Sequence, residues 1–357
     1  MQNKTEGHRY VGDVCFKEEL PMRGGKKRLL MDFALPDASV WPRPWPVILL
    51  VHGGTWIGWR MREDFPWHLV DEHGFALVRF DYRTAYEAPF PAQVADCRSA
   101  VRYVRKHASE YNIDPSRIGV KGVSSGGQLA SMLGVGDGAE GIDNKDEDLS
   151  VPVAVQAVVD DFGPSDILGL WRLMNLIHRY MDLNPLSGER AELMRQMQED
   201  PNFRPFSGLL ESPLAKIGSL VTFLPGVLGI VEGIKADWNF INAAKYLSGW
   251  ENGTAPILKD EALLRSVSPI EYVTGSLKKV GRKIPPFRIL HGHEDGFVPF
   301  HQSQTFADEL RKVGTEVEFD TDCGGGGHFP SGDHWHNVIL PKEIAFFKRY
   351  LSNGARC

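Results

Sequence analysis

Residues 46–51, PVILLV, form an uninterrupted apolar run, and this run constrains the fold more than any other feature of the chain. A strand that is apolar at every position is buried on both faces, which is typical of a parallel sheet covered by helices on both sides. Parallel strands also need a crossover connection between them, usually a helix. We therefore expect strands and helices to alternate along the sequence.

Further apolar runs supply this alternation. We predict strands over residues 28–35, 46–51, 75–80, 117–123, 153–159, 287–290 and 316–319. A helix is predicted at 91–107, where apolar residues recur at spacings of three and four and so form one stripe. These residues are Val94, Cys97, Val101 and Val104. The fold class that follows is α/β, with a mostly parallel central sheet flanked by helices.

The strand signal vanishes between about residues 165 and 267, a stretch rich in Leu, Met, Trp and Pro. We predict a large, mainly helical cap at 165–267, inserted between two core segments at 1–164 and 268–357. Ligands of open α/β sheets bind at the carboxyl ends of the strands, which favours a cap over that edge. The alternative is a surface insertion without a role in the site. Its aromatic residues could line an apolar pocket or simply fill a core; they include Trp171, Phe206, Phe223, Trp238, Phe240 and Trp250.

A candidate nucleophile lies between a predicted strand and a predicted helix. Gly122, Ser124 and Gly126 match the pattern G-x-S-x-G in this context. The turn is too tight for side chains two places before and after the serine, so glycine is required there. Ser125 has Val123 two places before it, and we therefore assign Ser124 and not Ser125 as the nucleophile.

The sequence HGGTW at residues 52–56 directly follows the apolar run. Negative charge develops on a carbonyl oxygen under nucleophilic attack, and preorganised N–H groups stabilise it. We assign this oxyanion-hole role to the N–H groups of Gly54, Thr55 and Ser125, with Gly53 shaping the turn. Trp56 is a candidate substrate-binding residue, with anchoring of the loop as the alternative for both Trp56 and His52. An ordinary strand-ending turn is the alternative for the whole segment.

The candidate acid is Asp295, which follows the predicted strand at 287–290 in the sequence HGHEDGFVP. A carboxylate just past a strand end can hold the Nδ1–H of an imidazole and stabilise the imidazolium as it forms. Glu294 beside it, and Asp160 and Asp161 after an earlier predicted strand, are the alternatives.

The candidate base is His328, in the sequence GGGGHF just after the last predicted strand. Its place after Asp295 agrees with the chain order nucleophile, acid, histidine that accompanies G-x-S-x-G turns. His334 and His336 are the alternatives, whereas His293 and His301 are assigned to a loop and to the following helix.

Charge and composition limit the kinds of molecule that this protein is expected to bind. The net charge is −6 and no block of Lys and Arg stands out, which argues against nucleic acid as a partner. The apolar segment 217–234 is interrupted by Pro225, several glycines and Glu232, so we interpret it as buried or lid helices and not as a membrane span.

Four widely spaced cysteines and a start without a signal-like apolar run favour the cytoplasm, unless a leader has been removed. We expect a small-molecule substrate, no metal and no cofactor; a homodimer is left open. The cysteines are Cys15, Cys97, Cys323 and Cys357.

Taken in order, HGGTW, DPSRIGVKGVSSGGQLA, VVDDFGPSDI, HGHEDGFVP and GGGGHF resemble the carboxylesterase and hormone-sensitive-lipase-like group of α/β-hydrolases, and most closely its feruloyl-esterase-like BD-FAE branch. The resemblance covers about residues 28–165 and 266–351. Thr55 stands where the family has a third glycine or a tyrosine, and Ser125 where it has alanine. Neither change removes a backbone N–H.

The resemblance implies hydrolysis of an uncharged or aromatic carboxylic ester of small to medium size through an acyl-enzyme on Ser124. HGG-x-W also occurs in arylformamidases, which keeps amide cleavage open. Related folds use the same machinery for acyl transfer or elimination in natural-product pathways, and a non-catalytic ligand receptor is a further alternative. Receptors of this kind usually lack one member of the triad, whereas all three candidates are present here.

Overall fold

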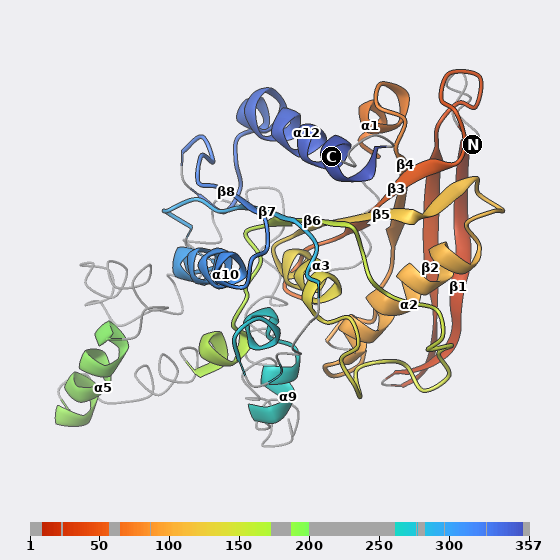
Figure 1. The fold of residues 1–357 in the computed structure, drawn as a ribbon. Coiled ribbons are helices and arrows are strands. Elements are labelled where there is room, and N and C mark those ends of the chain that lie inside the picture. Colours follow the sequence, from red (N-terminus) through yellow and green to blue (C-terminus); the bar gives the residue numbers. More distant parts are fainter. Residues whose placement is uncertain are drawn as a thin grey trace.

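The computed structural model describes residues 9–22, 24–56, 65–85, 87–172, 187–199, 261–275, 277, 283–295, 297–325 and 327–352. One eight-stranded sheet runs through this part of the chain, in the order β1-β2-β4-β3-β5-β6-β7-β8 (Figure 1). Its strands are β1 (Arg9–Met22), β2 (Gly25–Leu35), β3 (Trp45–Val51), β4 (Ala76–Phe80), β5 (Ile113–Val123), β6 (Ala157–Asp161), β7 (Phe287–Leu290) and β8 (Val317–Asp320).

The sheet is mostly parallel, as the apolar runs predict. β1 pairs with β2, and β2 with β4, in antiparallel fashion. The five remaining pairings, from β4–β3 through β7–β8, are all parallel. The carboxyl ends of β3, β5, β6, β7 and β8 therefore meet at one edge, and the segments that follow these strands are brought together there.

Helices cover both faces of the sheet. In Figure 1, α1 (Trp67–Asp71) and α12 (Leu340–Leu351) lie on one side, and α2 (Ala92–Lys106), α3 (Ser125–Val135) and α10 (Phe300–Lys312) lie on the other. Shorter elements are α9 (Glu261–Ser266), the 3₁₀ turn η3 (Pro269–Tyr272), α11 (Gly332–His334) and the π-helical turn η4 (Trp335–Ile339). α5 (Gly188–Glu199) projects from the body of the molecule in this view.

The core has two layers because alternate residues of a strand point to opposite faces. Val47 and Leu49 of β3 belong to the layer beneath α2 and α3, whereas Ile48 belongs to the layer that packs against α12. All three side chains are fully buried. Burial on both faces explains why the run PVILLV shows no polar alternation.

The structure contains one strand that was not predicted, and several strand boundaries differ from the prediction. β1 was not predicted, because its charged residues and three register shifts break the period of two that marks a strand. β6 begins at Ala157 and not at Val153, since its ladder with β5 starts at the pair Gly119–Ala157. Asp160 and Asp161, which we expected just past this strand, are its last two residues.

Only parts of the predicted cap lie within the described residues, namely helical residues 167–172, α5 and α9. Its two ends lie side by side. The Arg172 guanidinium donates to both carboxylate oxygens of Glu261, at 2.8 Å each. The Ser268 hydroxyl accepts the N–H groups of Ile167 and Leu168 at 3.0 and 3.3 Å. The segment 217–234 and the cap aromatics other than Trp171 lie outside the described residues, and the division into three segments stays a prediction.

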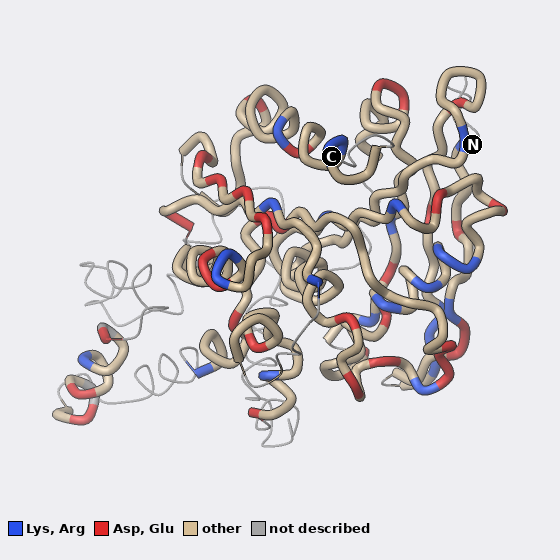
Figure 2. The backbone as a smooth tube through the Cα atoms, in the orientation of Figure 1, with Lys and Arg blue, Asp and Glu red and all other residues tan. Residues whose placement is uncertain are grey.

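Charged residues, helix length and cysteines are further features of the described chain. Figure 2 shows Lys and Arg interspersed with Asp and Glu along the described chain. Among the described helices, none is both long and apolar enough to cross a membrane. Cys15, Cys97 and Cys323 are free thiols, and Cys357 lies outside the described residues.

Candidate active site

Ser124 lies on a strained turn between β5 and α3. Its φ and ψ of 56° and −124° place it in a region that residues with a side chain rarely adopt. Two backbone bonds hold this conformation: Ser124 N–H donates to the Asp161 carbonyl at 2.8 Å, and its own carbonyl accepts the Gly127 N–H at 2.8 Å. The hydroxyl does not cap the helix, so it is available at the sheet edge.

Sterics explain the glycines on each side of this serine. A Cβ at Gly122 would lie 2.0 Å from the Gly126 carbonyl oxygen. A Cβ at Gly126 would lie 2.3 Å from the Val51 carbonyl oxygen at the end of β3. Both distances are far below van der Waals contact, and in each case the obstacle is rigid backbone. The glycines therefore let helix, turn and neighbouring strand approach closely enough to form the site.

The structure brings Ser124, His328 and Asp295 together. His328 Nε2 lies 3.1 Å from Ser124 Oγ, and His328 Nδ1 lies 2.6 Å from Asp295 Oδ2. The acid follows β7, the histidine follows β8, and both are buried. Three side chains that are far apart in sequence thus form one hydrogen-bonded chain, because the ends of neighbouring parallel strands meet at this edge.

The Asp295 carboxylate is held in its charged form. Burial alone would raise its pKa, but hydrogen bonds from His291 and His328 outweigh burial and hold the pKa of Asp295 well below its usual range. Its Oδ1 also accepts the backbone N–H groups of Phe297 and Val298, at 2.7 and 2.9 Å. Since a charged carboxylate can only accept, His328 must donate from Nδ1, which leaves Nε2 as the acceptor that faces Ser124.

The alternative acids are either exposed or bound to other groups. Glu294 is exposed. Asp160 accepts the Ser131 hydroxyl at 2.6 Å and the Gly163 N–H at 2.8 Å. Asp161 forms an ion pair with Lys121, with 3.3 Å between Nζ and Oδ2.

The alternative bases are likewise placed away from the serine. His334 Nε2 lies 3.1 Å from the carbonyl oxygen of Asp322 and 3.0 Å from its carboxylate. His336 is exposed on η4. Of the histidines weighed as bases, His328 is the one within hydrogen-bond distance of Ser124 Oγ.

The HGGTW loop lies against the candidate nucleophile. A Cβ at Gly53 would lie 2.7 Å from the Val123 carbonyl oxygen and 3.3 Å from Ser124 Cβ. Gly54 and Thr55 have φ of 104° and 57°. Within the described part of the chain, no hydrogen bond uses the N–H of Gly54 or Thr55 as donor. Ser125 is the first residue of α3, where an N–H has no partner inside the helix. Among the described residues, these three N–H groups are therefore without an acceptor.

Side chains of the loop hold it in place. The His52 ring stacks on Tyr82 with centroids 4.2 Å apart, and burial lowers the pKa of His52 to about 4, so this imidazole is neutral near pH 7. The buried Trp56 donates its indole N–H to Gln128 Oε1 at 2.9 Å. Gln128 in turn donates to the Val267 carbonyl at 2.7 Å, which connects the loop to the end of the predicted cap. Contact of Trp56 with a substrate stays a prediction.

Sequence reasoning did not single out the aromatic side chains around His328. The rings of Phe162, Phe297 and Phe329 lie with centroids 4.5, 5.0 and 4.7 Å from the imidazole. Phe162 and Phe297 are at least partly buried, whereas Phe329 is 61% exposed. Their position within two residues of Asp161, Asp295 and His328 is the one sequence signal that marks them.

Asp160→Asn tests the buried carboxylate beneath the turn. Burial, partly offset by the Ser131 and Gly163 hydrogen bonds, raises the pKa of Asp160 from 3.8 to about 6. A folded-state pKa above the unfolded value stabilises the fold at low pH, and that contribution is lost as the pH rises through 6. Asn stays neutral, and its amide oxygen can accept the Gly163 N–H while its NH₂ group donates to the Ser131 hydroxyl. Relative to the parent, its free energy of unfolding should therefore rise by about 3 kcal/mol between about pH 4 and pH 7.

Urea unfolding at the two pH values measures this difference. Asp333→Asn, which removes an exposed carboxylate, is the matched control for the loss of one charge. A stability difference for Asp160→Asn that is the same at both pH values would contradict the prediction.

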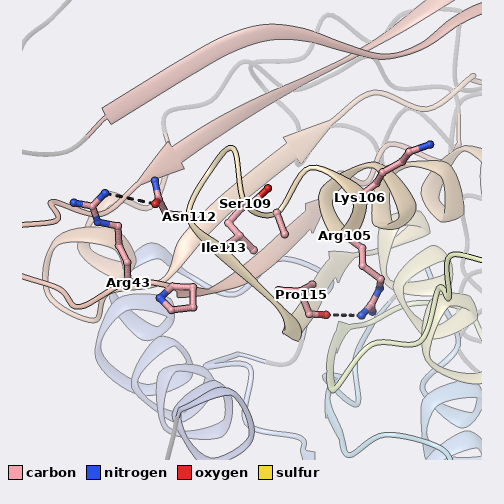
Figure 3. A pocket seen from close by; sticks show the side chains of 9 residues that line it. Arg43, Arg105, Lys106, Ser109, Asn112, Ile113 and Pro115 are labelled. Atoms are coloured by element: carbon pink, nitrogen blue, oxygen red, sulfur yellow. Dashed lines mark hydrogen bonds between the residues drawn. The ribbon is translucent and has the colours of Figure 1, made fainter.

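A pocket of about 490 Å³ lies near the start of β5, at the opposite end of that strand from Ser124. Figure 3 shows its basic side chains turned in different directions: Arg43 toward Asn112, Arg105 toward the Pro115 carbonyl, and Lys106 away from both. Because the charges do not converge, the pocket does not form an anion site. In the described ranges, no group of three or more His, Cys, Asp or Glu side chains is arranged to hold a metal ion.

Two family models match parts of this chain. The family model described as BD-FAE matches residues 31–201, and the model described as the prolyl oligopeptidase family matches residues 234–354. This chain has the α/β-hydrolase fold, and over residues 31–201 it is similar to the BD-FAE family.

Curated relatives of this α/β-hydrolase include esterases. Esterase LipQ of Mycobacterium tuberculosis is 24% identical over 82% of the chain and 51% of its own length. A probable isoprenylcysteine alpha-carbonyl methylesterase, ICMEL1 of Arabidopsis thaliana, is 25% identical over 83% of the chain and 47% of its own length. The chain thus spans about half the length of these relatives.

Among solved structures, a truncated carbohydrate esterase from gut microbiota has a TM-score of 0.61 and 22% identity, covering 97% of both chains. This likeness supports the α/β-hydrolase fold.

Proposed function

We propose that this α/β-hydrolase cleaves carboxylic esters through an acyl-enzyme on Ser124, with His328 as base and Asp295 as the orienting acid. The observation that carries the proposal is the continuous hydrogen-bonded chain from Ser124 Oγ through His328 to Asp295, beside a loop with available N–H donors. A nucleophile, an oriented base and donors for an oxyanion are the three parts that acyl transfer requires.

In the first half of the reaction, His328 Nε2 takes the Ser124 proton while Oγ attacks the ester carbonyl. The N–H groups of Gly54, Thr55 and Ser125 stabilise the oxyanion that forms. The imidazolium is stabilised by the charged Asp295 and gives its proton to the leaving alcohol. An acyl-enzyme on Ser124 remains.

Water completes the cycle by the same steps. His328 takes a proton from water, which attacks the acyl-enzyme carbonyl, and the same donors hold the second oxyanion. Collapse of this intermediate breaks the bond to Oγ and returns the proton to Ser124. The proposed reaction needs no metal or cofactor, because protein groups supply every proton and hydrogen bond.

The substrate that we propose is a small to medium ester with an apolar or aromatic portion. The exposed Phe329 ring lies 4.7 Å from the imidazole that would protonate the leaving alcohol. An apolar group on that alcohol could pack against this ring and leave water. Its burial would stabilise binding by about 25 cal/mol for each Å² of apolar surface.

Amide cleavage is the second candidate, because the prolyl oligopeptidase family model matches residues 234–354. Matched pairs such as phenyl acetate and acetanilide separate the two, since the acyl group and the ring are the same and only the leaving atom differs. We expect kcat/KM for the ester to exceed that for the amide. A kcat/KM for the anilide at or above that for the ester would identify an amidase instead.

A further inference from the structure

A second histidine contacts the candidate acid from inside the protein. His291 follows β7 and is fully buried. Its Nε2 lies 3.0 Å from the Val298 carbonyl oxygen and 3.2 Å from Asp295 Oδ2. Its Nδ1 lies 2.6 Å from the Ser303 hydroxyl on α10. The imidazole therefore connects a helix on one face of the sheet to the carboxylate at the sheet edge.

These partners define the tautomer of His291. The Val298 carbonyl oxygen and the Asp295 carboxylate can only accept hydrogen bonds, so Nε2 must carry a proton. In the neutral ring, Nδ1 carries a lone pair that accepts hydrogen bonds, and the Ser303 hydroxyl can donate to it. In this neutral form, Ser303 O–H donates to Nδ1, and Nε2–H points to Asp295 Oδ2 and Val298 O.

Asp295 consequently accepts from four donors, two on each oxygen. Oδ1 accepts the N–H groups of Phe297 and Val298. Oδ2 accepts from His328 at 2.6 Å and from His291 at 3.2 Å. With both oxygens engaged from different directions, rotation of the carboxylate would break at least two of these bonds.

We propose that His291 is a positioning residue, whose Nε2–H aims the Asp295 carboxylate at His328 and keeps it charged during turnover. This inference rests on the proposed function. When His328 takes the Ser124 proton, the imidazolium is stabilised only if Asp295 remains an anion. A second donor on Oδ2 makes that oxygen less basic, so the proton stays on His328 Nδ1.

Two substitutions of similar polarity separate positioning from packing. The amide nitrogen of Gln in His291→Gln can occupy the place of Nε2 and donate to Asp295. The shorter amide of His291→Asn reaches the level of Nδ1, near Ser303, and falls short of the carboxylate. Both variants lose the ring and leave a void, so a residue that only fills space would respond in the same direction to both.

We expect His291→Asn to lower kcat by about 10- to 100-fold with little change in KM, the range seen when the outer partner of a metal-bound imidazole is removed. His291→Gln should retain most of the parental kcat. Thermal unfolding compares the stability of the two folded variants.

Proton NMR gives a readout that is independent of turnover. The short His328 Nδ1–H···Asp295 bond should give a far-downfield signal in the parent and in His291→Gln. In His291→Asn this signal should broaden or move upfield. If the Asn variant does not fold, parental kcat and a parental signal in His291→Gln still support the role of Nε2–H, and their loss in a folded Gln variant overturns it.

The proposal is overturned if His291→Asn keeps the parental kcat and signal, or if both variants lose kcat equally. Ser124→Ala in the same assay tests the proposed ester hydrolysis separately from the positioning role of His291. Retained hydrolysis in Ser124→Ala refutes the proposed function, and the NMR comparison of the two His291 variants then decides the role of His291 alone.

Discussion

Ser124→Ala is expected to reduce kcat for an ester such as p-nitrophenyl acetate by about 10⁶-fold, the loss found when the nucleophile of a serine-protease triad is removed. The loss should be this large because His328 and Asp295 act only through the serine hydroxyl. The fold should persist, since the strained turn is held by the backbone N–H and carbonyl of residue 124, which alanine retains. Steady-state kinetics and circular dichroism measure the two effects.

Ser125→Ala is the matched variant. It removes a hydroxyl one residue away and keeps the backbone N–H that we assign to the oxyanion hole, so its loss of kcat should be far smaller. A fluorophosphonate should add one covalent group to the parent and none to Ser124→Ala, read by intact mass. Undiminished hydrolysis or labelling in Ser124→Ala would refute the assignment of the nucleophile.

Asp295→Asn is expected to lower kcat by about 10⁴-fold, as in the protease on which this change was measured. The contacts of Asp295 explain why the loss should be so large. The amide oxygen of Asn must take the place of Oδ1, because the N–H groups of Phe297 and Val298 need an acceptor there. The NH₂ group then faces His328 and turns its Nδ1 into an acceptor. The proton moves to Nε2, which can no longer take one from Ser124.

Glu294→Gln provides the control for this change. It neutralises the neighbouring carboxylate, which is exposed, and should leave kcat close to the parental value. The pair thus tests the choice of acid as well as its role. A larger loss in Glu294→Gln than in Asp295→Asn would reverse the assignment.

Much of the fold could be predicted because the sheet is buried on both faces. The run at 46–51 has no polar alternation for that reason, and the structure has a strand there. β1 could not be predicted in the same way. It is an edge strand with Lys17, Glu18 and Glu19 on or near its surface, and its bulges shift the pattern of exposure along it.

The three candidate site residues could be predicted because each is fixed by local chain geometry. Gly122 and Gly126 mark a turn that few other sequences can form, and Asp295 and His328 follow neighbouring strands. His291 could not be assigned a role from sequence, since its contacts depend on the packing of α10 beside β7. The rings around His328 were missed for a similar reason: their direction is set by tertiary contacts and not by periodicity.

The adjoining ends of the predicted cap, joined by Arg172 with Glu261 and by Ser268 with the backbone of residues 167 and 168, bear on how such a protein can diversify. Such a segment leaves the core and returns to it at neighbouring points. Because the entropy cost of closing a loop changes only slowly with its length, the segment can be lengthened, shortened or exchanged with little effect on stability. The reactive groups all lie outside that excursion. Replacing the predicted cap by another segment could thus alter which compounds are accepted, while the candidate site residues stay unchanged.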